Sequence, residues 1–373
     1  MKRLLLTPGP TPIPPDVLGA MGEPIIHHRT AEYKEIFKEA NDNLHKVFKT
    51  QNDIFTFTSS GTGAMEASVV NICSPGDKVI VVRGGKFGER FSDISKFYGV
   101  EAIPLDIEWG TAPDPSAVEV LLKAKKKVKA VYMSLCETAT ATAYDVKAIA
   151  KVVAQTDAVL VVDAISGLAA DELKTDEWGV DIVVAGSQKG LMLPPGLSFC
   201  SVSKKAWGLV ESARCPRFYL CFKGMKKALD KGDTPFTPAI TLVIGLRESL
   251  KIILADGLDK FMARNKTLAD ATRKAVKDLG LELFSKRPSD AVTAAKVPDG
   301  LDGEALIKDL RKKHGVWFAG GQAALKGKIF RIAHMGSIRP SDMREGFAAL
   351  EDILKAMGHK FEPGSGLKEL KKL

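Results

Sequence analysis

Short apolar runs alternate with amphipathic stretches between residues 53 and 201. The runs are DIFTFT from Asp53, KVIVVR from Lys78, KAVYMS from Lys129, AVLVVD from Ala158, DIVVAG from Asp181 and LSFCSV from Leu197. Runs of this kind are typical of buried strands in a mostly parallel sheet. Candidate helices lie between them, at 64–71, 87–97, 116–124 and 146–154. The alternation predicts a doubly wound α/β layer, whose ligands bind beyond the carboxyl ends of the strands.

The pattern changes towards the C-terminus. Residues 238–277 form a long helical stretch that could bridge two domains, and the remainder has the mixed pattern of a small α+β domain. Its candidate strands are 281–286, 291–297, 316–320 and 329–334, with helices near 303–312 and 341–357. We therefore expect a large α/β domain over residues 1–255, including an N-terminal arm at 1–20, and a small C-terminal domain over 256–373.

Composition narrows the functional classes. The chain has 373 residues, of which 45% are hydrophobic and 27% charged, as in soluble globular proteins, and neither a membrane span nor a secretory segment is visible. We expect a cytoplasmic protein with no membrane partner. The net charge of +9 comes largely from lysine runs without interleaved aromatics, so nucleic-acid binding is not expected. The five cysteines show no CxxC and no histidine at zinc spacing, so no metal site is predicted.

Lys189 follows the strand at 181–186, between Gly186 and Gly190. A lysine at a strand end is by itself more often exposed to solvent. Here the flanking glycines permit close approach of a ligand, and Pro194 and Pro195 stiffen the loop that follows. A lysine that forms a Schiff base needs such a fixed, partly desolvated place, so that its amine is neutral and nucleophilic. Lys189 is therefore the candidate nucleophile.

Asp163 ends the preceding strand of the pattern, AVLVVD. A cap for the next helix is the simpler interpretation of this aspartate alone. Because parallel strands end at one edge of a sheet, however, Asp163 and Lys189 should face one cleft. That combination suits pyridoxal phosphate (PLP), whose ring nitrogen pairs with a carboxylate that keeps it protonated.

The turn Ser59–Ala67 (SSGTGAMEA) follows the strand DIFTFT and opens a helix. Backbone N–H groups at a helix start, with a threonine hydroxyl, can cradle a phosphate. The turn lacks the lysine of a P-loop and the GxGxxG of a dinucleotide site. One phosphate, rather than a nucleotide, is the predicted ligand.

Eight motifs follow one another from Leu6 to about Leu354: PGPT, SSGTGAMEA, GKFGER, CETATAT, VVDAISG, GSQKGLMLPPG, TPFTP and FRIAHMG. In these motifs and their order the chain resembles the class V PLP-dependent aminotransferases, especially the alanine–glyoxylate and serine–pyruvate branch. The resemblance implies fold type I of the PLP-dependent transferases, with a mostly parallel seven-stranded-type sheet in the large domain. It also implies PLP as the cofactor.

The resemblance assigns roles to further residues. Thr62, Gly63 and Ala64 would hold the cofactor's phosphate, with Ser187 and Gln188 beside Lys189. Phe87 would stack on the cofactor ring, and Thr138 would place a hydroxyl near it. Thr234 would reach the phosphate from a partner subunit, which implies a homodimer with shared active sites. Gly9 and Arg331 would meet the substrate, Arg331 by gripping its carboxylate bidentately; without the motifs, Phe87 would be a core aromatic and Arg331 a surface ion-pair residue.

The expected reaction is transamination between a small amino acid (alanine, serine or aspartate) and a small 2-oxo acid (pyruvate or glyoxylate). The chain departs from many relatives at Leu135 and Ala141, has Phe87 in place of the usual tryptophan, and has Lys231 where some place a tyrosine. A 2-aminoethylphosphonate–pyruvate aminotransferase therefore stays an alternative. So does a non-catalytic subunit of a larger assembly, although intact Lys189 and Asp163 oppose it.

Two other enzyme classes are disfavoured. Cysteine desulfuration needs a cysteine well after the lysine, and the last one is Cys221. An NAD-dependent oxidoreductase would need the absent GxGxxG turn.

Overall fold

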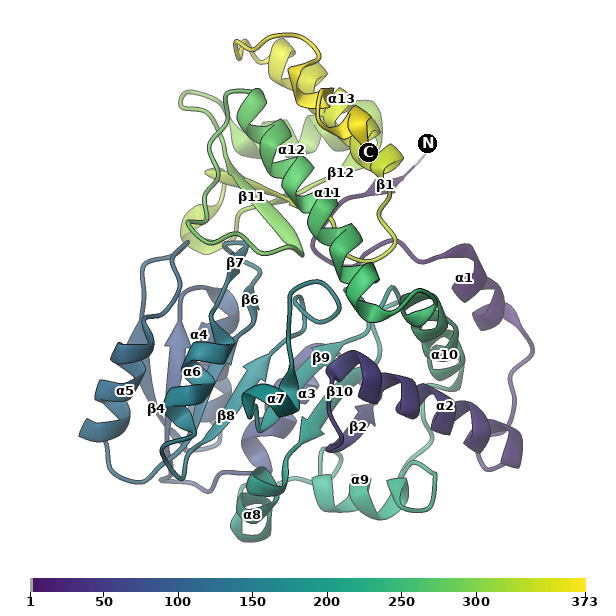
Figure 1. The fold of residues 1–373 in the computed structure, drawn as a ribbon, viewed down its shortest axis with the longest axis vertical. Helices are drawn as coiled ribbons and strands as arrows, with labels where there is room; N and C mark the ends of the chain where they lie inside the picture. The colour runs from purple at the N-terminus through teal and green to yellow at the C-terminus, as the bar shows by residue number, and fades with distance from the viewer. Residues whose placement is uncertain (1–2) are drawn as a thin grey trace.

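A seven-stranded sheet forms the centre of the larger part of the molecule (Figure 1). The computed structural model describes residues 3–373. Six of the seven strands run in one direction, and β10 pairs antiparallel with both of its neighbours. The predicted mostly parallel sheet is confirmed. In sheet order the strands are β2 (Asp53–Phe57), β10 (Ser198–Val202), β9 (Ile182–Gly186), β8 (Val159–Asp163), β5 (Val128–Ser134), β3 (Lys78–Arg83) and β4 (Glu101–Asp106).

Helices cover both faces of this sheet, which explains why its inner strands are mostly apolar on both faces. Successive side chains of a strand point to opposite faces. Ile80 and Val82 join a cluster with one set of helices, and Val79 and Val81 join a second cluster on the other face. The first set is α1 (Pro15–Gly22), α2 (Ala31–Phe48), α5 (Pro115–Ala124), α6 (Val146–Val153) and α10 (Ile240–Leu254); the second is α3 (Gly61–Val70), α4 (Lys86–Phe97), α8 (Lys204–Ser212) and α9 (Phe222–Leu229). A one-turn helix, α7, spans Thr175–Trp178.

A smaller region lies above the sheet in Figure 1, around an antiparallel sheet in the order β11-β14-β13. Its own hydrophobic core gathers side chains from this sheet and from the surrounding helices. The strands are β11 (Val292–Lys296), β13 (Ala319–Gly320) and β14 (Ile329–Ala333); the helices are α11 (Leu258–Asp278), α12 (Gly303–Asp309) and α13 (Pro340–Ala356), with a π-helical turn at Leu310–His314 and 3-10 turns at Ala323–Leu325, Ser365–Leu367 and Leu370–Lys372.

Several elements differ from those expected. The strand expected at 281–286 is only an isolated bridge between Leu283 and Ala295. The one expected at 316–320 is divided into β12 (Val316–Trp317) and β13. The long helical stretch is interrupted at Gly257, whose φ of 90° is left-handed and favours glycine. The strand β4 and the helix α2 were not expected.

The N-terminus connects the two regions. Strand β1 (Leu4–Leu5) pairs in parallel with β12, so this strand lies beside elements that the sequence assigns to the small domain (Figure 1). From there it returns to the carboxyl edge of the large sheet, where Thr11 N–H donates to the carbonyl of Gln188. The domain boundary near residue 255 stays a prediction. Within residues 3–373, no helix combines the length and apolarity needed to cross a membrane.

Candidate active site

The candidate residues from five strands gather at one edge of the large sheet. Strands β2, β3, β5, β8 and β9 run in the same direction, so their carboxyl ends lie together. Asp163 is the last residue of β8, and the segments that follow the other four strands carry Thr62, Phe87, Thr138 and Lys189, in chain order. A ligand at this edge would therefore meet side chains that are far apart in sequence.

Lys189 is held in a nearly closed environment. It is 9% exposed, and its Nζ donates a hydrogen bond to the carbonyl of Pro8. Gly9 lies directly against it: a Cβ there would be 2.5 Å from Cε of Lys189. Burial lowers the pKa of Lys189 to about 8, and the charge of Arg331 acts in the same direction. Near neutral pH a useful fraction of the amine is thus unprotonated.

Asp163 ends β8, beside Val184 of β9. Its Oδ1 accepts the N–H of Ile165 at 2.8 Å. Burial raises the pKa of Asp163 to about 6, while this hydrogen bond and the positive charge of Lys189 lower it. The carboxylate is therefore mostly ionised at pH 7 and available to a cationic partner.

The first turn of α3 contains Thr62, Gly63 and Ala64. The preceding residue, Ser60, makes no side-chain hydrogen bond that caps the helix. The N–H of Gly63 donates to the carbonyl of Ser60 at 2.8 Å. The other N–H groups of a first turn have no helical partner, and together with the helix dipole they favour an anion. Nη1 of Arg90 donates to Oγ1 of Thr62 at 3.2 Å, which brings a positive charge to the same turn.

The side chains of Ser187 and Gln188 differ in their hydrogen bonds. The hydroxyl of Ser187 donates to the carbonyl of Pro194 at 2.6 Å and accepts the N–H of Leu197, so it stabilises its own loop. Oε1 of Gln188 is buried, and no residue within 3–373 gives it a hydrogen bond. A buried polar atom without a partner is costly and indicates a missing one.

Phe87 lies in the first turn of α4, and the guanidinium of Arg90 stands 4.9 Å from the centre of its ring. Arg90 is a site residue that the sequence interpretation missed. Its position three residues after Phe87, on the same helix face, was the available signal. Within residues 3–373 it forms no ion pair, so its charge is free for a ligand.

Arg331 lies in β14 and reaches the same site from the small region. Its Nε and Nη2 donate to the carbonyl of Gly320 at 3.1 and 2.8 Å, and its Nη1 donates to the carbonyl of Thr138 at 2.9 Å. The hydroxyl of Thr138 meets that of Ser166 at 2.6 Å. Burial lowers the pKa of Arg331 to about 10, which leaves it cationic. No carboxylate of the described chain pairs with it.

Glu137 was also missed, because its sequence context suggests only a neighbour of Thr138. It is fully buried, and its carboxylate accepts three backbone N–H groups, those of Phe87, Gly88 and Ala139. Burial raises its pKa to about 7 against the effect of these hydrogen bonds.

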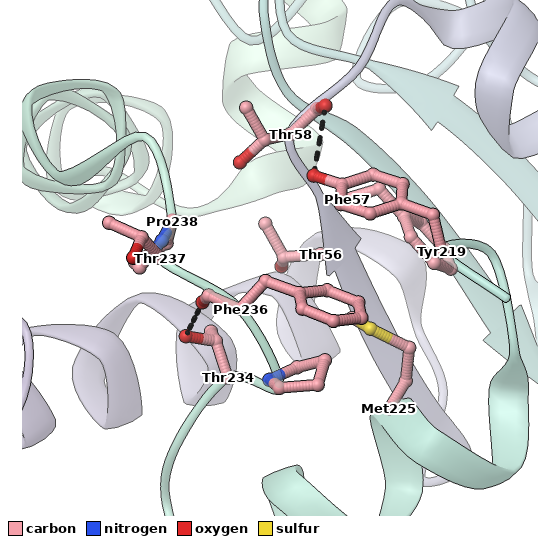
Figure 2. A pocket seen from close by; sticks show the side chains of 10 residues that line it. Thr56, Phe57, Thr58, Tyr219, Met225, Thr234, Phe236, Thr237 and Pro238 are labelled. Atoms are coloured by element: carbon pink, nitrogen blue, oxygen red, sulfur yellow. Dashed lines mark hydrogen bonds between the residues drawn. The ribbon is translucent and has the colours of Figure 1, made fainter.

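Thr234 is not brought to Lys189 within one chain. Figure 2 shows it in a separate pocket with Tyr219, Met225 and Phe236, where its hydroxyl donates to the carbonyl of Phe236 at 2.8 Å. Its own carbonyl accepts from Arg29 at 2.9 Å. Its expected role requires a partner subunit, so that role stays a prediction.

Comparison with known proteins places this geometry in a family. The chain is 36% identical to an L-aspartate–glyoxylate aminotransferase of Paracoccus denitrificans, over 97% of this chain and 94% of that protein. It is 39% identical to a soluble hydrogenase small subunit of Synechococcus, over 98% and 97%. Its fold matches the crystal structure of a ureidoglycine–glyoxylate aminotransferase from Bacillus subtilis with a TM-score of 0.94 and 27% identity, over 100% and 98%. Since the model of the class-V aminotransferases also matches residues 3–346, the chain belongs to the class V aminotransferase family.

Proposed function

We propose that this aminotransferase moves an amino group between a small amino acid and a small 2-oxo acid, with PLP joined to Lys189 by a Schiff base. The observation that carries the proposal is a buried lysine of lowered pKa that follows β9, together with a buried carboxylate at the end of the neighbouring strand β8.

The residues present suit the cofactor. The uncapped first turn of α3 and Arg90 offer an anion site for its phosphate. Phe87 has a flat apolar face for the cofactor's ring. Asp163 would keep the ring nitrogen protonated. When bound, the cofactor supplies a carbonyl carbon for the amino group and an electron sink for the charge left when the α-proton is removed.

The protein's own residues supply binding and proton transfer. Arg331 would hold the substrate carboxylate, because a planar guanidinium matches a carboxylate with two parallel hydrogen bonds. Lys189, once its amine is free, would take the proton from the substrate's α-carbon onto Nζ. It would then pass this proton to the reacting carbon of the cofactor. Its lowered pKa suits both steps. The carbonyl of Pro8 would hold the free amine within reach, and Gly9 leaves the space in which it moves.

Glyoxylate is the favoured acceptor, since it appears in the names of two of the similar proteins. Alanine, serine and aspartate are the proposed donors. The similarity to a hydrogenase subunit keeps a non-catalytic role as the competing proposal.

We further propose a cytoplasmic homodimer with shared active sites. Phe218 and Tyr219 are 83% and 42% exposed and pack against Phe236, which lines the pocket of Thr234. Exposed aromatic clusters of this kind commonly mark interfaces. A partner seated there would bring its own Thr234 pocket close to this chain.

The test is the visible spectrum of the purified wild type and of Lys189→Ala, with single additions of alanine, serine, aspartate and 2-aminoethylphosphonate. The proposal expects an absorbance band from the lysine-bound cofactor that is missing in the variant and bleaches with one amino acid donor. Bleaching with 2-aminoethylphosphonate alone would move the reaction to that substrate. A wild type that binds PLP but responds to no donor would favour the non-catalytic role, and one that binds none would refute the cofactor assignment.

A further inference from the structure

Glu137 carries a buried charge that the proposed reaction does not use. Its side chain is fully inaccessible to solvent, and a carboxylate is costly to bury unless hydrogen bonds replace its hydration. It lies in the short strand β6 (Cys136–Glu137), which pairs with β7 (Thr142–Ala143) beside the site.

The hydrogen bonds of Glu137 join it to the helix that carries Phe87. Its Oε2 accepts the N–H groups of Phe87 and Gly88, both at 3.1 Å, and its Oε1 accepts that of Ala139 at 3.1 Å. The first two belong to the first turn of α4, where the helix dipole also favours a negative charge. Gly85 makes room, since a Cβ there would lie 2.4 Å from Cδ of Glu137.

Glu137 is also linked to Arg331. The next residue, Thr138, offers its carbonyl to Nη1 of Arg331 at 2.9 Å. The negative charge of Glu137 raises the pKa of Arg331, against the larger effect of burial. The negative charge of Asp163 in turn raises the pKa of Glu137. Above its pKa of about 7, Glu137 therefore places a buried negative charge near Arg331, while its own hydrogen bonds are to the backbone.

We propose that Glu137 is a positioning residue: its carboxylate fixes the first turn of α4, and with it Phe87, while its charge weakens the hold of Arg331 on a substrate carboxylate. The inference rests on the proposed function, because it takes Arg331 as the carboxylate-binding residue. A weaker hold is useful because binding substrate and transition state equally tightly does not raise kcat, and the product must leave.

Glu137→Gln tests the charge, because glutamine keeps the shape and one acceptor oxygen. The probe is propionate, a carboxylate without an amino group, titrated by calorimetry into the PLP-saturated enzyme at low ionic strength. The titration is done at about pH 8.5, between the pKa values of Glu137 and Arg331, where both groups are charged. Removing a nearby buried anion should tighten propionate binding by roughly fivefold or more. A purely structural role predicts the opposite, weaker or unchanged binding.

Asp171→Asn is the matched control. Asp171 is likewise buried, and accepts the N–H of Asp290 at 2.7 Å and the hydroxyl of Ser289 at 2.5 Å. This variant should lose thermal stability as Glu137→Gln does, yet leave the propionate Kd unchanged. A similar tightening in both variants would overturn the inference.

Two further variants separate the possible failures. Arg331→Gln should abolish propionate binding; if it does not, the proposed carboxylate site is wrong. If it does and Glu137→Gln binds propionate no more tightly than the wild type, the inference alone fails. Glu137→Asp keeps the charge but withdraws it from α4, so propionate affinity should stay within about twofold while PLP binds more weakly. Unchanged PLP affinity in that variant would overturn the anchoring role, even if the glutamine variant does not fold.

Discussion

Lys189→Met should stabilise the cofactor-free protein at neutral pH while removing its proposed chemistry. Burial lowers the pKa of Lys189 from 10.5 to about 8, so the folded state holds the proton less well than the unfolded chain does. Stability therefore rises with pH across this window: the penalty is fully present below about pH 8 and disappears above 10.5. Methionine has nearly the same length and carries no charge to bury.

The size of the effect follows from the same two values. The difference between 10.5 and about 8 corresponds to a penalty of roughly 3 kcal/mol at pH 7. The methionine also loses the hydrogen bond to the carbonyl of Pro8, which costs about 1 kcal/mol. The net gain in the free energy of unfolding should be about 2 kcal/mol at pH 7.

Urea denaturation of the cofactor-free wild type and variant measures this gain, at one protein concentration and at steps from pH 7 to 10. The variant should be more stable at pH 7, and its advantage should shrink as pH rises. Lys147→Met, at an exposed position of α6, is the control and should show no such trend. An advantage that is constant with pH, or a variant less stable than wild type at pH 7, would refute the argument from burial.

Four other outcomes are expected. Gly9→Ala should cut kcat/KM at least roughly tenfold, because its φ of 135° is strained for alanine and the new Cβ meets Lys189; a near-normal rate would refute the contact. Arg331→Gln should raise KM for the amino acid roughly tenfold to a hundredfold in steady-state kinetics, as expected for losing a charged hydrogen-bond donor, with the bound cofactor's spectrum unchanged. Asp163→Asn should lower kcat far more than KM, since its carboxylate is proposed to support the electron sink; equal changes would contradict this. Mixed dimers of Thr234→Ala and Lys189→Ala chains should regain one active site per dimer if Thr234 serves the partner, and none if it acts within its own chain.

The sequence predicts the inner strands of the large sheet well, and the edge strand β4 and some strands of the small region poorly. Strands buried on both faces, such as β8 and β9, consist almost entirely of apolar residues, and their limits are close to those expected. Strand β4 was missed because it lies at the sheet edge, with five partly or fully exposed positions and Pro104 among its residues. The expected strand at 281–286 makes only one bridge, so its apolar alternation reflects packing rather than pairing.

The sequence likewise predicted some residues of the candidate site and missed others. Lys189 and Asp163 could be proposed because each follows a recognisable strand, and the order of strands alone places them at one edge. Arg90 and Glu137 were not proposed, because the hydroxyl of Thr62 and the N–H groups of α4 to which they hydrogen-bond are distant from them in the sequence. Nothing in the local sequence around Glu137 indicates that the first turn of α4 will lie over its carboxylate.

Burial displaces the pKa values of the site residues, which no sequence motif indicates. Lys189, Asp163, Glu137 and Arg331 bring two positive and two negative charges into one poorly hydrated site, and burial is the largest cause of every displaced pKa among them. In each case it favours the neutral form, which raises the pKa of the acids and lowers that of the bases. The pKa values of Lys189, Asp163 and Glu137 consequently lie between about 6 and about 8, where a proton is exchanged at little cost near neutral pH. Arg331 stays charged because its ordinary pKa is so high, and so it alone among the four is suited to hold an anion at every working pH. The enclosure that destabilises the folded chain by burying these groups is thus the same feature that makes the site suitable for moving protons.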